Sequence, residues 1–120
     1  MQSKVNFQDD VAIIPLKGNF MGEPETAELR EQIYSLINDS FLQVVVDVSK
    51  VKWMNSSGLG ALISALTSLK SKGGDLRIAN LTEKVESLFV ITQLVKVFKT
   101  YDSIDRAVAS FRVDLIPAKS

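Results

Sequence analysis

Apolar and polar positions change their spacing along the chain, and each change predicts an element of secondary structure. Residues 42–48 are almost continuously apolar, which is typical of a strand buried on both faces of a parallel sheet. Residues 59–69 carry apolar side chains three and four positions apart, which predicts an amphipathic helix. Its expected buried stripe consists of Leu59, Leu62, Ile63, Leu66 and Leu69. This strand and helix form the centre of the predicted fold.

The residues before this centre predict a hairpin and a first helix. Residues 4–8 alternate polar and apolar positions, and residues 11–17 return as a second strand after the turn at Asp9 and Asp10, so the two segments are expected to pair as an antiparallel hairpin. Pro15 has no N–H for a ladder hydrogen bond, which predicts a bulge or an unpaired side there. After a loop over residues 18–22, Pro24 suits the first turn of a helix. The buried stripe of that helix is expected to be Leu29, Ile33, Leu36 and Ile37.

The residues after the centre predict two short strands and two helices. Residues 76–79 and 95–99 are expected to be strands, and Thr82 and Asp102 are expected to cap the helices that follow them. The last helix carries its apolar side chains at helical spacing. These are Ile104, Ala107, Val108 and Phe111.

This order of elements predicts an α/β fold in one domain. Strands and helices alternate after the hairpin, which favours a mixed, mainly parallel β-sheet with right-handed crossovers and about four helices. The helices are expected to lie mostly on one face of the sheet. We place the domain at residues 1–112 and interpret residues 113–120 as a C-terminal tail.

Charge and composition narrow the possible partners. The 120 residues include 14 basic and 14 acidic side chains, so no net field draws the chain to nucleic acid or anionic lipid. No apolar run approaches the length of about 20 residues that a membrane-spanning helix needs, and the chain does not open on a signal peptide. We therefore expect a cytoplasmic protein with no membrane insertion and no nucleic-acid partner.

Two absent residue types exclude much catalytic chemistry. The chain has no cysteine, which excludes thiolate catalysis and cysteine-ligated metals. It has no histidine, which removes the commonest general base and the commonest transition-metal ligand. We expect no metal site, no cofactor and no enzymatic activity.

The turn between the central strand and its helix carries the candidate chemistry. Ser56 and Ser57 lie at the predicted start of the helix, where a nucleophilic serine of a hydrolase would stand. Met54 replaces the first glycine of the G-x-S-x-G motif, and no histidine is present to accept the proton. Gly58 and Gly60 resemble a phosphate-binding loop, but the G-x-x-x-x-G-K-[ST] spacing is absent. Neither a serine hydrolase nor a phosphate-binding loop fits well, which leaves the interpretation that another protein modifies one of these serines.

A phosphorylated aspartate is a further alternative for this part of the chain. Asp47 stands near the end of the central strand, where a response-regulator receiver carries its phospho-acceptor. A receiver also needs an acidic pair after its first strand to hold Mg²⁺, and Asp9 and Asp10 instead lie in the hairpin turn. Asp47 is more simply interpreted as a structural residue that accepts hydrogen bonds from loop amides.

Residues 47–60 read DVSKVKWMNSSGLG and resemble the signature of STAS domains. The family pattern is D-x-S-x-V-x-x-[ML]-D-S-[ST]-G-[LI]-x-x-L, and the chain departs from it at Asn55, where the family has aspartate. The resemblance is strongest to the stand-alone anti-sigma factor antagonists of bacteria, and it extends over nearly the whole chain. It implies the STAS fold.

The resemblance also implies a regulatory switch. Ser56 would be phosphorylated by an anti-sigma factor that is a serine protein kinase of the GHKL ATPase type. The unphosphorylated chain would bind this kinase and free a sigma factor, and a PP2C-type phosphatase would reset the phosphorylated chain. ATP and Mg²⁺ would belong to the partners. The surroundings of the phosphosite would be Asp47, Asn55, Ser57 and Gly58.

The outward positions of the predicted helix support a protein interface. Small, uncharged side chains occupy this face up to Lys70, whereas a solvated helix face normally carries lysine and glutamate. We expect Gly60, Ala61 and Ser64 to contact the partner. Packing of this face under the first helix or the tail is the alternative structural interpretation. The alternative function is that of a non-phosphorylated STAS subunit in a signalling scaffold or a lipid-transport ATPase complex.

Overall fold

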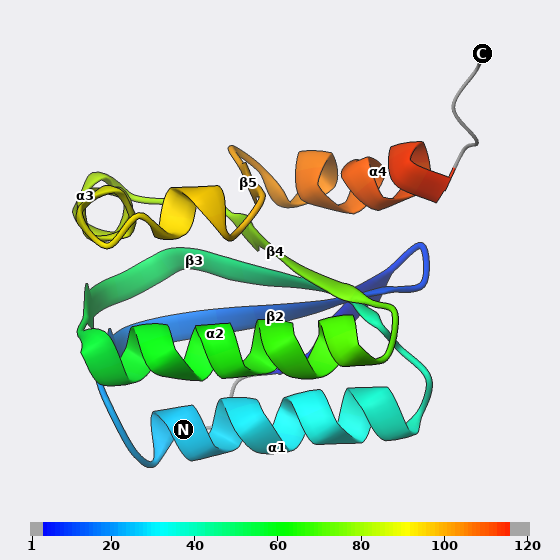
Figure 1. Cartoon of the computed structure of the whole chain (residues 1–120), viewed down its shortest axis with the longest axis horizontal. Coiled ribbons are helices and arrows are strands. Elements are labelled where there is room, and N and C mark those ends of the chain that lie inside the picture. Colours follow the sequence, from blue (N-terminus) through cyan, green and yellow to red (C-terminus); the bar gives the residue numbers. More distant parts are fainter. Residues whose placement is uncertain (1–3, 116–120) are drawn as a thin grey trace.

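The computed structural model describes residues 4–115, which form one mixed sheet and four α-helices (Figure 1). The five strands lie in the order β1-β2-β3-β4-β5. Only the β1–β2 pair is antiparallel among the described strands. The strands are β1 (Asn6–Gln8), β2 (Val11–Phe20), β3 (Gln43–Met54), β4 (Asp75–Ala79) and β5 (Thr100–Tyr101). The helices are α1 (Glu25–Asn38), α2 (Ser56–Ser71), α3 (Glu83–Ile91) and α4 (Ile104–Leu115). The predicted α/β fold with an N-terminal hairpin is confirmed.

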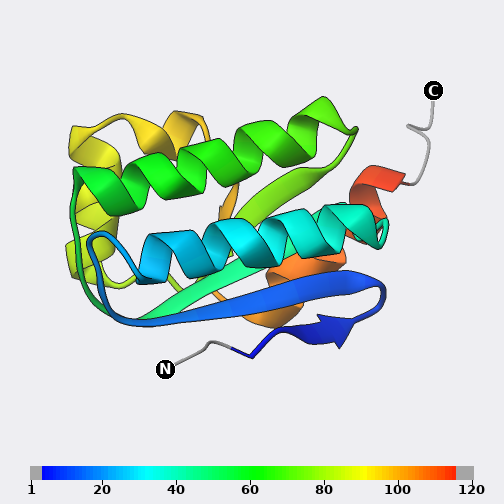
Figure 2. The same cartoon turned by 90° about the horizontal axis from the view of Figure 1, so that it is seen from below.

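The helices cover the sheet unequally (Figures 1 and 2). Helices α1 and α2 lie side by side on one face, and α4 lies on the other. Helix α3 contributes Val85 and Phe89 to the larger core, which lies on the α1–α2 side. A smaller core joins Ala107, Val108 and Phe111 of α4 to the opposite face of the sheet. Most of the buried apolar side chains therefore lie beneath α1, α2 and α3.

The centre of β3 is buried from both sides, as the sequence predicts. Val44 and Val46 belong to the larger core, whereas Val45 belongs to the smaller one, and all three are fully buried. This division follows from the alternation of side chains along a strand. The continuous apolar run thus serves two cores.

Strands β2 and β3 run further than the sequence predicts. The expected loop over residues 18–22 is strand up to Phe20, and the expected loop after residue 48 is strand up to Met54. The two extensions pair with each other in parallel, and the pairing ends at Phe20 and Met54. The register shifts between Pro15 and Lys17, which confirms the irregularity predicted at Pro15. Hydrogen bonds between two distant segments stabilise residues whose local pattern indicates a loop.

The buried stripe of α2 differs from the prediction at one position. Ile63 is 37% exposed, whereas Ala65 is buried and takes its place in the stripe. Positions 58, 62, 65 and 69 follow one helical line, and α1 packs along the side of α2 that carries Ala65. An isoleucine therefore lies on the outer side of the helix.

The region after α3 contains a second difference. The strand expected over residues 95–99 is wrong, because a short 3₁₀ helix spans Leu94–Lys96 and the strand β5 follows at Thr100–Tyr101. Leu94 and Phe98 are buried four positions apart, whereas Val95 and Val97 are exposed. Helical spacing of the two buried side chains therefore prevails over the β propensity of the valines.

Of the two capping residues predicted for the last two helices, Thr82 is confirmed and Asp102 is wrong. Thr82 caps α3 by accepting a hydrogen bond from the Val85 N–H at 3.5 Å. Asp102 was expected to cap α4, but the Ser103 hydroxyl accepts from the Arg106 N–H at 3.1 Å. Asp102 instead forms an exposed ion pair with Arg106 at 3.4 Å. The cap of α4 is therefore Ser103, one residue after the predicted Asp102.

Helix α4 extends to Leu115, three residues past the predicted domain boundary. The boundary at residue 112 stays a prediction, and the rest of the predicted tail, residues 116–120, lies outside the described residues. Within residues 4–115, no helix has the length and hydropathy required to cross a bilayer.

Candidate functional site

The turn from β3 into α2 is held by the side chain of Asn55. Asn55 has extended backbone angles, and its Oδ1 atom accepts a hydrogen bond from the Gly58 N–H at 3.1 Å. The Asn55 carbonyl oxygen accepts from the Leu59 N–H at 2.9 Å. The Asn55 side chain thus satisfies one of the four N–H groups that a helix start leaves without partners, and its carbonyl oxygen accepts the first hydrogen bond of the helix itself. The first helical residue is therefore Ser56.

Gly58 lets the end of β2 approach the start of α2. A Cβ atom at this position would overlap the carbonyl oxygen of Phe20 and would lie 2.9 Å from the Cγ atom of Met54. Phe20 and Met54 are the paired last residues of β2 and β3. A glycine is required here because of close packing, and the whole site rests on the ends of two parallel strands.

Ser56 and Ser57 are exposed at the positive end of α2. The first turn of α2 consists of serine, glycine and leucine, whereas the first turns of α1, α3 and α4 each carry acidic side chains. The partial positive charge of this helix start is therefore not compensated within its own first turn. A negative group on either hydroxyl would be stabilised here.

Asp47 lies apart from Ser56, although the sequence places it in the surroundings of the predicted phosphosite. Its Oδ1 atom accepts hydrogen bonds from the Ser49 N–H and the Asn80 side-chain amide, both at 3.0 Å. The part of β3 from Asp47 to Met54 spans about 23 Å at about 3.3 Å per residue. The structure therefore does not bring Asp47 to the Ser56 turn. Asp47 ties β3 to the residue after β4, consistent with its structural interpretation.

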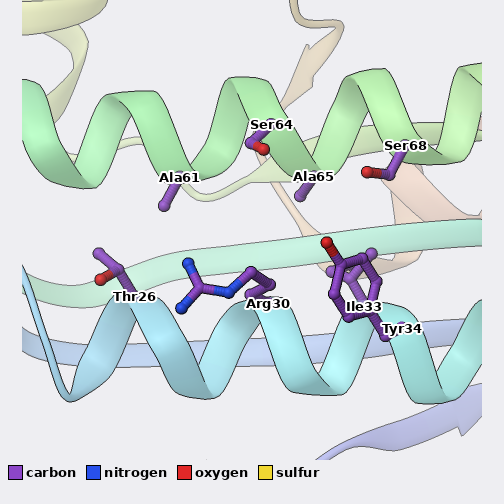
Figure 3. Close-up of a pocket in the computed structure, with 8 residues that line it drawn as sticks. All are labelled: Thr26, Arg30, Ile33, Tyr34, Ala61, Ser64, Ala65 and Ser68. Carbon is purple, nitrogen blue, oxygen red and sulfur yellow. The ribbon is translucent and has the colours of Figure 1, made fainter.

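The three residues expected to contact a partner differ in their surroundings. Gly60 and Ser64 are exposed, whereas Ala61 is half-buried and packs against the larger core. Figure 3 shows Ala61 directed from α2 toward α1, in a narrow groove whose α1 side carries Arg30 and Tyr34. The small side chains of α2 thus differ in exposure: Ala61 packs toward α1, whereas Gly60 and Ser64 are open to solvent.

Sequence reasoning did not single out Trp53, two positions before the helix cap. Its indole is 57% exposed, and the Nζ atom of Lys84 lies 4.5 Å from its ring centroid. Met21 after β2 and Ile63 on α2 are also exposed apolar side chains. The sequence alone could have drawn attention to Trp53, because it is the single tryptophan of the chain and lies directly before the serine turn.

The family model for the STAS domain matches residues 2–107. The chain belongs to the STAS domain family. One relative of this STAS domain is a candidate anti-sigma factor antagonist of Thermotoga maritima, 30% identical over 76 residues. That match covers 63% of this chain and 67% of the relative. The anti-sigma-B factor antagonist of Bacillus subtilis is 33% identical over 66 residues, which cover 55% of this chain and 60% of the relative.

Solved structures share the fold of this STAS domain over almost its full length. The crystal structure of the Thermotoga maritima protein has a TM-score of 0.83 and 24% identity, and covers 92% of this chain and 94% of that one. The phosphorylated form of SpoIIAA, a Bacillus cell fate determinant, has a TM-score of 0.72 at 15% identity. It covers 91% of this chain and 98% of its own. At these identities the likeness shows the fold alone.

Proposed function

We propose that this STAS domain is an anti-sigma factor antagonist that binds its partner when Ser56 is unphosphorylated and releases it when Ser56 is phosphorylated. The observation that carries the proposal is the exposed Ser56 hydroxyl at an uncompensated helix start, held in place by Asn55 and Gly58. The names of the two relatives support the function, and the phosphorylated SpoIIAA supports the modification.

The chain acts as a phosphoryl acceptor and not as a catalyst. The Ser56 oxygen attacks the γ-phosphorus of ATP held by a GHKL-type serine kinase, the bond to the β-phosphate oxygen breaks, and ADP leaves. The hydroxyl proton passes to a base of the kinase, because this chain has no histidine to accept it. A PP2C-type phosphatase returns the serine by transferring the phosphoryl group to water. This proposal assigns the metal and the nucleotide to the two partners.

The phosphate is expected to block docking without unfolding the domain. A phosphoserine adds about −1.5 to −2 charges at pH 7, and a helix start favours such a charge by roughly 0.3–1 kcal/mol when exposed. A partner that closes over Ser56 would have to remove the dianion from water, which is strongly unfavourable. The penalty therefore falls on the complex.

Phosphoryl transfer from purified GHKL-type kinases of the same organism tests the proposal directly. With labelled ATP, we expect phosphate on the wild-type chain and on Ser57→Ala, but not on Ser56→Ala. The position is read by mass spectrometry of the peptides. Phosphate on Ser57 alone would overturn the assignment to Ser56.

The alternative function gives a different result in the same experiment. A STAS subunit of a scaffold or of a lipid-transport ATPase complex would remain unmodified with every kinase. It would also co-purify with its assembly whether or not ATP is present. Such an outcome would overturn the partner-switching proposal.

A further inference from the structure

A pocket beside the serine turn lies between the end of β3 and helix α3. Its volume is about 120 Å³, and it is lined by Lys52, Trp53, Met54, Lys84, Val85 and Leu88. Small-molecule sites usually enclose about 300–1,000 Å³. The pocket therefore has room for one side chain and not for a cofactor or a drug-sized ligand.

The pocket and the serine turn share a side chain. Met54 lines the pocket, and its Cγ atom also lies beside the start of α2, 2.9 Å from the position of a Cβ on Gly58. In Figure 1, α3 lies at the same end of the molecule as the start of α2. A protein that closes over Ser56 therefore meets the same end of the molecule as the pocket.

The lining combines an apolar interior with positive charge. Val85 is 2% exposed and Met54 is 8% exposed, and Leu88 is half-buried. Both charged side chains of the described lining are lysines, Lys52 and Lys84. The Lys84 ammonium is held over the Trp53 ring at 4.5 Å, which fixes a positive charge at the edge of the pocket. The matching surface is an apolar side chain next to a carboxylate.

We propose that this pocket is a second anchor for the protein that docks on Ser56, and that it accepts an apolar side chain flanked by an acidic residue of that partner. The inference rests on the proposed function. Trp53 is the central contact, because an exposed tryptophan beside a pocket provides a large apolar surface with little loss of side-chain freedom. Lys84 pairs with the partner's carboxylate and discriminates against partners that present a basic residue there.

A purely structural use of the same contact makes a different prediction. If Lys84 and Trp53 only attach α3 to β3, removing either side chain lowers the melting temperature and leaves partner binding unchanged once the protein is folded. If they form an anchor, removal weakens binding and leaves the melting temperature close to that of the wild type, because Trp53 is 57% exposed. Both quantities are therefore measured.

The test uses the purified GHKL-type kinases of the same organism as probes, with calorimetric binding to the unphosphorylated chain. We expect Trp53→Ala and Lys84→Glu each to weaken binding at least about tenfold, as loss of an interface anchor typically does. Trp53→Phe keeps an aromatic ring and should lose less. The matched control is Lys72→Glu, the same charge change at the exposed opposite end of α2.

Fluorine labelling gives a second readout that does not depend on variants. The chain has one tryptophan, so 5-fluorotryptophan yields a single ¹⁹F resonance from Trp53. We expect this resonance to shift or broaden when the unlabelled kinase is added. An unchanged resonance, or tight binding by Trp53→Ala and Lys84→Glu, would overturn the second anchor while kinase binding and Ser56 phosphorylation leave the proposed function intact. If no kinase binds or modifies the wild-type chain, both proposals fail.

Discussion

The Oδ1 atom of Asn55 accepts a hydrogen bond from the backbone N–H of Gly58 at 3.1 Å and closes the first turn of α2. The STAS signature has aspartate at this position, and an asparagine makes the same bond without the charge. Because the amide is neutral, it does not repel a phosphate on the next residue. The cap thus holds Ser56 in place in both states of the proposed switch.

Removal of this cap should loosen the site. We expect Asn55→Ala to destabilise the domain by about 1 kcal/mol, the usual effect of losing an N-cap side chain. A thermal melt should show a decrease of about 4 °C. Asn55→Asp is the matched control, because it keeps the acceptor and adds the charge of the family signature. Equal melting temperatures for wild type and Asn55→Ala would contradict the role assigned to the cap.

The two glycines at the start of α2 should respond in opposite ways to alanine. At Gly58 the new methyl group would overlap the Phe20 carbonyl oxygen, so we expect a loss of about 1–3 kcal/mol from overpacking. At Gly60 a Cβ meets no atom within 4 Å among the described residues. Gly60→Ala should therefore be neutral or stabilising by up to about 1 kcal/mol, as in other helix interiors. Denaturant unfolding of both variants measures the difference, and the same sign for both would refute this packing account.

Two residues of α2 that line the groove beside α1, exposed Ser64 and half-buried Ala61, should separate binding from stability. Ser64 is exposed, so Ser64→Arg should leave the melting temperature close to that of the wild type. A bulky charge in a docked interface should weaken binding of the GHKL-type kinase by about 1 kcal/mol or more. Ala61 points into the groove beside α1, and Ala61→Arg should instead lower stability by about 1–3 kcal/mol. Unchanged kinase binding by folded Ser64→Arg would place the interface elsewhere.

Substitution of the phosphosite should change binding and leave the fold intact. Ser56→Ala is expected to bind the kinase as the wild type does and to resist phosphorylation. Ser56→Asp should fold normally, with the added charge favoured at the helix start by roughly 0.3–1 kcal/mol, but bind poorly. Ser57→Asp, one position along the same exposed turn, is the comparison. Calorimetric binding measures all four proteins, and equal affinities would exclude Ser56 as the switch.

The sequence by itself determined the centre of the fold and the position of the serine turn. The nearly continuous apolar run at residues 42–48, interrupted in its second half only by Asp47, has few alternatives to a strand buried on both faces. Asn55, Ser56 and Gly58 lie between this run and a helical stripe, so the start of α2 followed from local spacing and capping preferences. These signals act over a few residues, and local reasoning finds them.

Only the tertiary structure decided how far the strands run and what lies beside the serine. Residues 49–54 read as a loop, and they are strand because β2 pairs with them in parallel up to Phe20. That extension places the end of β3, directly before the Ser56 turn, about 23 Å along the strand from Asp47. It also brings Trp53 beneath Lys84 of α3. Each of these outcomes depends on contacts between segments far apart in the chain, whose energies local spacing does not contain.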